Sequence, residues 1–305
     1  MSIPSDLNAS DALAKRTLAG MERETRNAYK AAYKSMQGTF AELYAKYETG
    51  GVLTYAEMVK YNRLKMMEIE LQATVYDLYK TESVMLNQEL NGMYQSGYYR
   101  TAYAIERDIQ AKLSYLPLDA TKIRLAIQNP ISGLTLDQTL AKNRAAIVSK
   151  INQEVTRGLI KGQSYGKMSK TIKDVLGGDA KKAIRVAQTE AHRIHNEARY
   201  DSVKHADDIG VSMVKVWVSA LDDRTRDAHR SLDGAEVGVT DDFRSGNGGQ
   251  GKSPGMMGTA ADDINCRCTF IIQVAGFKPE FRRVRGEGVV PYTTYDDWAR
   301  AKSIK

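Results

Sequence analysis

Both cysteines of this 305-residue chain and one of its four histidines fall within a single segment, residues 217–268. Cys266 and Cys268 are separated by one residue, and His229 precedes them in the same segment. Thiolate and imidazole are ligands that zinc favours, so these three side chains could hold a metal ion. Four further side chains are candidates for a fourth ligand: His192, His195, Asp222 and Asp263.

The spacing of the cysteines favours a structural role instead. Structural zinc sites usually place two or more residues between paired cysteines, and here only one residue intervenes. In the metal-free interpretation, Cys268 fills a small space in the core, and His229 hydrogen-bonds a short helix to the loop at Asn265. We therefore expect no metal, no cofactor and no catalytic residue. A disulfide between Cys266 and Cys268 would be strained, which indicates a reducing compartment.

An enzyme is the alternative from another functional class. It would be a metal-dependent hydrolase or nuclease built on His229, Cys266, Cys268 and Glu190. Such an enzyme needs a concave pocket with an open metal position, whereas a structural domain has its polar groups mutually satisfied. We expect Glu190 to form a buried ion pair with one of three arginines: Arg185, Arg224 or Arg226.

One motif in the segment is misleading. Residues 246–253, Gly-Asn-Gly-Gly-Gln-Gly-Lys-Ser, match the pattern of a phosphate-binding loop. That loop requires a buried strand before it and a helix after it. The preceding residues make a poor core strand, and Pro254-Gly255 stops any helix. We interpret the stretch as a flexible excursion between two halves of a domain.

The order of residues in this segment resembles the Mu F-like minor head proteins of tailed bacteriophages, the head morphogenesis family. The shared pattern is a Trp, then Asp-x-x-Thr-Arg-x-x-His-x-x-Leu-x-Gly, then Asn-Cys-Arg-Cys. It is carried here by Trp217, Asp222, Thr225, Arg226, His229, Gly234, Asn265, Cys266, Arg267 and Cys268. An upstream motif of the family is matched by Thr189, Glu190, Arg193 and Asn196, and we add Arg185 to the structural motif.

The resemblance implies a minor head protein of few copies, associated with the portal vertex. Its implied roles are capsid assembly and handling of viral DNA during packaging or ejection. The implied partners are the portal protein and, as further candidates, the major capsid or a scaffolding protein. The implied location is the capsid interior near the portal, after assembly in the host cytoplasm. Some members carry a paired cysteine near Asp222, where this chain has Thr225-Arg226, which argues against a family-wide metal site.

Positive charge is concentrated in one part of the chain. The net charge is +7 and the pI about 9.1, which favours an anionic partner. Residues 141–185 hold eleven Lys or Arg against three acidic residues. The segment has no motif that would recognise individual bases, so we expect double-stranded DNA to bind without sequence specificity. The expected DNA contacts are Lys142, Arg144, Lys150, Arg157, Lys161, Lys167, Lys170, Lys173, Lys181 and Lys182. A second basic cluster occupies residues 278–285.

The first 176 residues have helical periodicity. An apolar stripe with spacings of three and four predicts a long helix beginning after Thr54: Leu64, Met67, Leu71, Val75 and Leu78. Thr135 begins a second helix that runs to about Ile160, and a shorter one spans 167–176 and ends at Gly177-Gly178. Tyr and Met residues between 76 and 103 suit either helix packing or a docking surface for a protein.

The pattern changes after Gly178, which is our expected domain boundary. We expect four elements beyond this boundary: a helix over 179–208, a strand at 213–218, a short helix capped by Asp222 and running to Leu232, and a strand over 266–274. This mixture of helices and strands predicts an α+β domain. We therefore expect a helical portal- or scaffold-contact domain (1–176), a Mu F-like domain (179–275) and a basic tail (276–305). No stretch approaches the roughly 20 apolar residues of a membrane span, and we expect no membrane contact.

Overall fold

The computed structural model describes residues 3–274, 281–284 and 288–291. The chain forms two compact units, each assembled from segments far apart in the sequence. Unit 1 contains residues 1–19, 88–136 and 188–305, and unit 2 contains residues 20–87 and 137–187. The units therefore interleave along the chain, rather than following one another at Gly177-Gly178 as we had expected.

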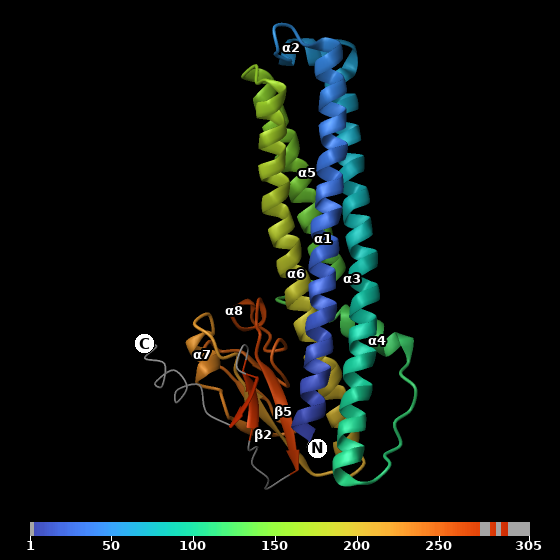
Figure 1. Ribbon diagram of the computed structural model, residues 1–305, viewed down its shortest axis with the longest axis vertical. Coiled ribbons are helices and arrows are strands. Elements are labelled where there is room, and N and C mark those ends of the chain that lie inside the picture. Colours follow the sequence, from blue (N-terminus) through green and yellow to red (C-terminus); the bar gives the residue numbers. More distant parts are fainter. Residues whose placement is uncertain (1–2, 275–280, 285–287, 292–305) are drawn as a thin grey trace. The chain divides into compact units, whose positions relative to one another are not determined.

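Unit 2 is helical. The long helices that contribute to it lie side by side within the unit (Figure 1) and span Ile3–Tyr47 (α1), Arg63–Ile109 (α3), Leu136–Ile160 (α5) and Tyr165–Asp208 (α6). The predicted apolar stripe of α3 is confirmed, because Met67, Leu71, Val75 and Leu78 are all buried. The helix expected between Thr135 and Ile160 is also present, as α5.

Two predicted helix boundaries in unit 2 are wrong. Thr54 does cap a helix, through the backbone N–H of Glu57, but this is the short α2 (Tyr55–Val59). The turn η1 (Lys60–Asn62) follows, and there Tyr61 and Asn62 have φ of 54° and 58°. This left-handed backbone cannot continue a right-handed helix, so α3 begins separately at Arg63.

The second wrong boundary is Gly177-Gly178, because α6 passes through both glycines without a break. Leu176 and Ala183 are buried on either side of them. Glycine costs about 1 kcal/mol in a helix interior relative to alanine, and the packed apolar face on both sides outweighs that cost. Gly-Gly lowers helix propensity without imposing an end.

Unit 1 has an antiparallel sheet of order β2-β1-β5. These strands span Glu236–Gly238 (β2), Met213–Val218 (β1) and Thr269–Val274 (β5). The other described elements of the unit are α4 (Ala120–Ile127), α7 (Asp227–Arg230), β3 (Phe243–Arg244), β4 (Gln250–Gly251), α8 (Ala260–Asp263), β6 (Phe281–Val284) and β7 (Gly288–Pro291). Helices and strands together confirm the α+β class. The strand expected from alternation at 213–218 is present as β1. The strand expected over 266–274 is also present, but it begins only at Thr269, so both cysteines lie in the loop before it.

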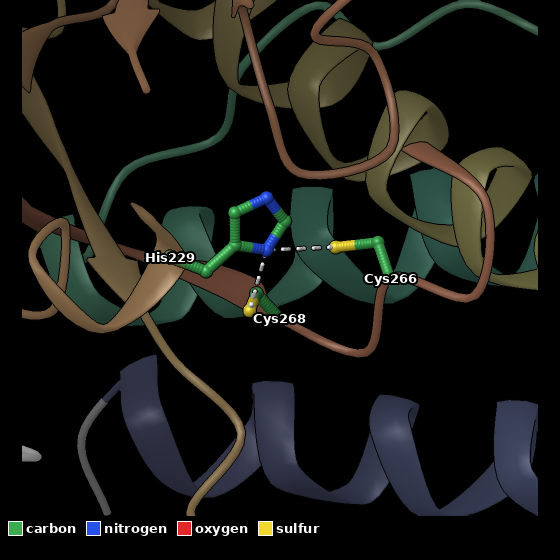
Figure 2. A group of neighbouring side chains, drawn as sticks. All are labelled: His229, Cys266 and Cys268. Carbon is green, nitrogen blue, oxygen red and sulfur yellow. Dashed lines mark hydrogen bonds between the residues drawn. The ribbon is translucent and has the colours of Figure 1, made fainter. Parts of the chain in front are cut away.

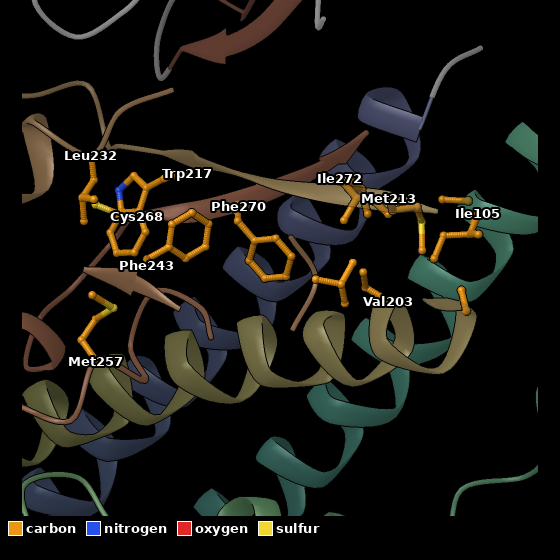
Figure 3. Close-up of a cluster of buried hydrophobic side chains, with 14 of the residues drawn as sticks. Ile105, Val203, Met213, Trp217, Leu232, Phe243, Met257, Cys268, Phe270 and Ile272 are labelled. Carbon is orange, nitrogen blue, oxygen red and sulfur yellow. The ribbon is translucent and has the colours of Figure 1, made fainter. Parts of the chain in front are cut away.

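The core of unit 1 lies between one face of this sheet and the C-terminal part of α6 (Figure 3). Trp217 on β1 stands at a T-shaped angle to Phe243, with ring centroids 5.2 Å apart. Phe270 and Ile272 on β5 face Val203 on α6 in the same cluster. Both cysteines belong to this core. The segment that carries the two cysteines is therefore part of the packed interior of unit 1.

Part of the expected basic tail, residues 276–305, falls outside the described residues. That includes Lys278 and Arg285 of the second basic cluster. Strands β6 and β7 pair with each other in antiparallel register. In the part of the chain that the structure describes, no helix is long and apolar enough to cross a membrane.

Candidate functional site

His229, Cys266 and Cys268 meet in the core of unit 1. Helix α7 carries His229, and the loop before β5 carries both cysteines. The Nδ1 atom of His229 lies 3.5 Å from the Cys268 sulfur and 3.8 Å from the Cys266 sulfur, and Figure 2 shows both sulfurs directed at this one nitrogen. The three residues are only 1–3% exposed, and both cysteines are free thiols.

Asp262 holds the opposite edge of the imidazole. Its carboxylate lies 3.1 Å from Nε2 of His229. The same carboxylate accepts hydrogen bonds from Ser245 Oγ at 2.8 Å, Asn247 Nδ2 at 3.0 Å and Thr259 Oγ1 at 2.8 Å. Burial alone would raise the pKa of Asp262, but these bonds outweigh it and lower the pKa, so the group is a carboxylate.

Sequence reasoning missed Asp262. A local signal was present, because Thr259 Oγ1 accepts from the backbone N–H of Asp262, as in a helix N-cap. That pattern explains why α8 begins where it does. It gives no indication that the Asp262 carboxylate turns toward a histidine 33 positions earlier in the chain.

The three groups of the cluster shift one another's pKa values. A hydrogen bond from Cys266 lowers the pKa of the Cys268 thiol, and the reverse effect together with burial raises that of Cys266. Burial lowers the pKa of His229, but bonding to the Cys268 sulfur and to Asp262 outweighs burial and raises it. In the absence of a metal, negative charge therefore concentrates on Cys268, next to His229.

Backbone geometry fixes the cysteine loop. Asn265 has a left-handed φ of 58°, a conformation that asparagine tolerates better than most residues. Its N–H donates to Thr189 Oγ1 at 3.2 Å. The Asp263 carboxylate accepts the backbone N–H groups of Met257 and Gly258 at 2.7 and 2.8 Å. Asp263, a candidate fourth metal ligand, is thus committed to holding this loop.

Arg193 is the centre of a buried charge network on α6. It bonds Glu190 through Nε and Nη2, at 3.0 and 2.8 Å, and Glu197 through Nη1, at 2.5 Å. It also donates to the backbone carbonyls of Ala126 and Ile127 at the end of α4, at 2.8 and 3.0 Å. All three guanidinium nitrogens are therefore used inside the protein.

The buried ion pair predicted for Glu190 exists, but its partner was predicted wrongly. Glu190 pairs with Arg193, three residues along the same helix, in place of the expected Arg185, Arg224 or Arg226. The i, i+3 spacing puts Glu190 and Arg193 on one face of α6. Arg226 is occupied elsewhere, because it donates to the carbonyls of Ile264 and Asp262.

Asn196 and Arg199 join α6 to β5. Asn196 donates to the carbonyls of Pro254 and Cys268, at 3.1 and 3.2 Å, and accepts from Thr269 Oγ1 at 2.9 Å. Arg199 donates to Thr269 Oγ1 at 2.7 Å and to the Phe270 carbonyl at 2.8 Å. Arg199 therefore belongs to the site, and sequence reasoning had assigned it no role there.

The two remaining histidines proposed as metal ligands point elsewhere. His192 Nε2 contacts the carbonyl oxygen of Cys268, not its sulfur. His195 Nε2 lies 2.8 Å from the Asp11 carboxylate, which also pairs with Arg199. Neither histidine therefore completes a ligand set around the cysteines.

Asp222 does not cap a helix, which corrects our prediction. Helix α7 begins only at Asp227 and ends at Arg230. The Asp222 carboxylate instead accepts the Arg224 N–H at 3.0 Å and forms a two-bond ion pair with Arg267. The bonds from Arg267 are the largest effect lowering the pKa of Asp222, to about 2. This pair ties the loop after β1 to the cysteine loop.

Three further motif residues form hydrogen bonds in the loops around β1 and α7. Thr225 Oγ1 donates to the Ala220 carbonyl. Gly234 has φ of 79° in the turn that follows α7, and its N–H donates to the Trp217 carbonyl at 2.9 Å. Trp217 is fully buried, and its indole N–H donates to Ser219 Oγ at 3.2 Å.

The glycine-rich stretch is an anchored hairpin, so our expectation of a flexible excursion is wrong. Strands β3 and β4 pair across it, and no helix begins directly after Ser253, since the next helix is α8 at Ala260. The buried Lys215 donates to the carbonyls of Asp241 and Lys252, both at 2.8 Å. A Cβ added at Gly251 would lie 1.8 Å from the Met256 carbonyl oxygen. Glycine is required here for close packing of the backbone.

The ten expected DNA contacts lie in unit 2, on a different unit from the His/Cys cluster. Helix α5 carries Lys142, Arg144, Lys150 and Arg157, Lys161 follows it, and α6 carries Lys167, Lys170, Lys173, Lys181 and Lys182. Nine of the ten are exposed. Arg144 is half-buried, with its guanidinium 5.2 Å from the centre of the Tyr76 ring.

Comparison with known proteins now bears on this arrangement. The family described as "Phage Mu protein F like protein" matches residues 149–271, a range that contains all of the Cys/His and α6 motif residues. The chain is 36% identical over 286 residues to the "Minor head protein GP7" of Bacillus phage SPP1, covering 92% of each chain. The chain belongs to the Mu F-like family of phage minor head proteins. This confirms the resemblance seen in the sequence.

A second relative carries a different name. The chain is 31% identical over 205 residues to "NAD(+)--arginine ADP-ribosyltransferase EFV" of Enterococcus faecalis (strain ATCC 700802 / V583). The match covers 67% of this chain but only 42% of that protein. Among solved structures, none gave a significant match.

Family membership supports a role in assembly of the phage head and a place among the components of the virion. The polar groups of the motif agree with a structural domain, because in the described residues they bond chiefly to one another and to the backbone. The principal examples are the pairing of Arg193 with two glutamates, of Asn196 with β5 and its preceding loop, and of Asp222 with Arg267.

Proposed function

We propose that this minor head protein associates with the portal inside the capsid and contacts the viral DNA during packaging or ejection. The observation that carries the DNA part is the exposed basic surface of unit 2, formed by α5, α6 and the turn between them. Membership of the minor head protein family supports the portal part.

The basic surface is not neutralised by neighbouring acidic groups along most of its length. Glu154 pairs with Lys150 and with Arg157, at 2.8 and 2.9 Å. Among the described residues, four exposed lysines in the turn and the first part of α6 form no ion pair: Lys161, Lys167, Lys170 and Lys173. Free ammonium groups attract phosphates without reading bases. These four lysines are therefore the proposed principal DNA contacts.

A salt titration tests this proposal. The four lysines would be changed together to Glu, and binding to a random-sequence DNA duplex would be measured across salt concentrations. The loss of four phosphate contacts should make the slope of log K against log salt shallower by about 3 to 4. The matched control changes four exposed lysines of α1 and α3 to Glu: Lys30, Lys34, Lys65 and Lys80.

The control keeps the same change in net charge within the same unit. If both variants lose DNA binding equally, total charge is responsible and the assigned surface is wrong. Wild-type affinity that does not respond to salt contradicts phosphate contact altogether.

Exposed tyrosines are the proposed portal contacts. Tyr79, Tyr94 and Tyr98 of the Tyr- and Met-rich stretch are buried and serve packing. Tyr99 and Tyr103 on α3 stay 40% and 59% exposed. A ring left in water gains free energy when a partner covers it, and tyrosine is enriched at protein interfaces. Tyr76 is also exposed, but it lies in unit 2 and stacks with Arg144. Tyr99 and Tyr103 are the exposed tyrosines of the stretch that lie in unit 1, and docking is assigned to them.

A binding assay with purified portal tests the assignment. The full chain must be used, because a fragment ending at residue 176 would cut α6 and remove the residues that pack unit 1. We expect Tyr99→Ser with Tyr103→Ser to weaken portal binding at least tenfold. The control is Tyr55→Ser with Tyr61→Ser, two exposed tyrosines of unit 2. Equal affinity of the two variants contradicts the proposed contact.

A further inference from the structure

The cluster of His229, Cys266 and Cys268 has a geometry that goes beyond packing. We propose that His229 Nδ1 and the two sulfurs bind one thiophilic divalent cation, for which zinc is the natural occupant. One ligand atom from each residue lies within 4.8 Å of the other two, and the group is buried. Neither the family assignment nor the portal and DNA roles includes this site.

The two nitrogen–sulfur distances match those of a tetrahedral zinc site. Zinc binds imidazole nitrogen at about 2.0–2.1 Å and thiolate sulfur at about 2.3 Å. At a tetrahedral angle these bond lengths place nitrogen and sulfur about 3.6 Å apart. The two nitrogen–sulfur distances in the protein are 3.5 and 3.8 Å. A cation would therefore fit between the three atoms with little movement of the side chains.

The imidazole is oriented as in a metal ligand. Asp262 lies against Nε2 of His229, so in the neutral imidazole Nε2 carries the proton and Nδ1, which faces the sulfurs, has the free lone pair. Carboxylate–histidine pairs of this kind fix the tautomer and raise the basicity of a ligating nitrogen. Asp262 is itself held by three other side chains. The carboxylate–imidazole pair is thus preorganised before any ion binds.

The lone pair of Nδ1 can accept from only one of the two thiols at a time. A cation bound between the three atoms would engage both sulfurs and Nδ1 at once.

The four candidate protein ligands for a fourth position are committed elsewhere. Asp222 pairs with Arg267, Asp263 accepts backbone N–H groups, His192 contacts a carbonyl and His195 pairs with Asp11. None of these four side chains completes the ligand set, so the proposed site has three protein ligands. The site is a buried, three-residue anchor that joins α7 to the β5 loop.

Metal content tests the proposal directly. Full-length protein without a histidine tag would be purified and its zinc measured by elemental analysis. Cobalt(II) would then be added to metal-depleted protein, because thiolate-bound tetrahedral cobalt has characteristic charge-transfer and d–d absorption. We expect about one zinc per chain and a cobalt spectrum with two thiolate ligands. The spectrum of the wild-type protein does not depend on whether any variant folds.

Variants locate the site. Cys268→Ser and Cys266→Ser should each abolish stoichiometric zinc, and Asp262→Asn should weaken zinc affinity about 10- to 100-fold. His205→Gln is the control, because His205 contacts only the Ser114 carbonyl and the Tyr115 ring among the described residues. No zinc and no cobalt charge-transfer band in the folded wild type would overturn the proposal, as would equal zinc loss in His205→Gln.

Discussion

Arg193→Met should destabilise the protein by several kcal/mol, and the loss should depend on pH. The substitution keeps most of the side-chain volume of Arg193 but removes the guanidinium that five hydrogen bonds use. It leaves Glu190 and Glu197 buried without their cation. The backbone carbonyls of Ala126 and Ile127 lose a donor as well.

The size of the effect follows from those broken bonds. Removal of one partner from a buried ion pair costs about 3–5 kcal/mol, because the other charge stays buried and uncompensated. Burial raises the pKa of Glu197 to about 7 even with Arg193 present, and raises that of Glu190. Without Arg193 both pKa values rise further, so the glutamates protonate on mild acidification. The cost should be about 3–5 kcal/mol at pH 8 and clearly smaller at pH 5.

Chemical denaturation followed by circular dichroism, at pH 5 and pH 8, measures both values. Arg157→Met is the matched control, since Arg157 is exposed and pairs only with Glu154 among the described residues; it should cost less than about 0.5 kcal/mol. Adding Glu190→Gln and Glu197→Gln to Arg193→Met should recover part of the stability at pH 8. A loss of equal size at both pH values would refute the reasoning, because buried carboxylate charge would then not be its cause.

Glu82 gives a second pH dependence. Burial raises its folded-state pKa from 4.5 to about 7, so its contribution to the unfolding free energy should fall by up to about 3 kcal/mol as pH rises from 4.5 to 7. The total fall over that range should therefore be smaller in Glu82→Gln than in the wild type, and an equal fall in both would contradict the assignment. Gly251→Ala should destabilise unit 1, because the added Cβ would collide with the Met256 carbonyl. The exposed Gly246→Ala should cost less, because a Cβ there meets only Ala228 Cβ at an ordinary 3.7 Å, and equal melting temperatures for the two variants would contradict the packing. Trp217→Ala should cost about 3–5 kcal/mol through loss of the largest core side chain, as measured by thermal melting, while retention of the wild-type melting temperature would place the indole outside the core.

Periodicity predicted the elements whose apolar faces are regular. The stripe from Met67 to Leu78 and the alternation from Met213 to Val218 each correspond to one helix or strand in the structure. These patterns are readable because burial repeats with the period of the element itself. Boundaries were less predictable. Gly177-Gly178 has the composition of a helix end, yet α6 continues because its neighbours remain packed.

The pairing of polar groups was largely unpredictable. Glu190 was expected to bond an arginine, and it does, but Arg193 was not among the candidates. Asp222 has the residue type of a helix cap, and its actual partner is Arg267, 45 positions later. The short-range signals in the sequence were real, but a carboxylate can satisfy a cap, a turn or an ion pair, and the choice depends on which donor the fold brings near.

By itself the sequence determined the α+β class, the family and the concentration of basic residues in 141–185, because residue types, their order and their period are local properties of a chain. Only the tertiary structure decided that Asp262 orients His229, that two sulfurs converge on one nitrogen, and that the glycine-rich stretch is an anchored hairpin. Those relations join positions up to 39 residues apart. Contacts at such separations depend on how helices and strands pack, which no local pattern encodes.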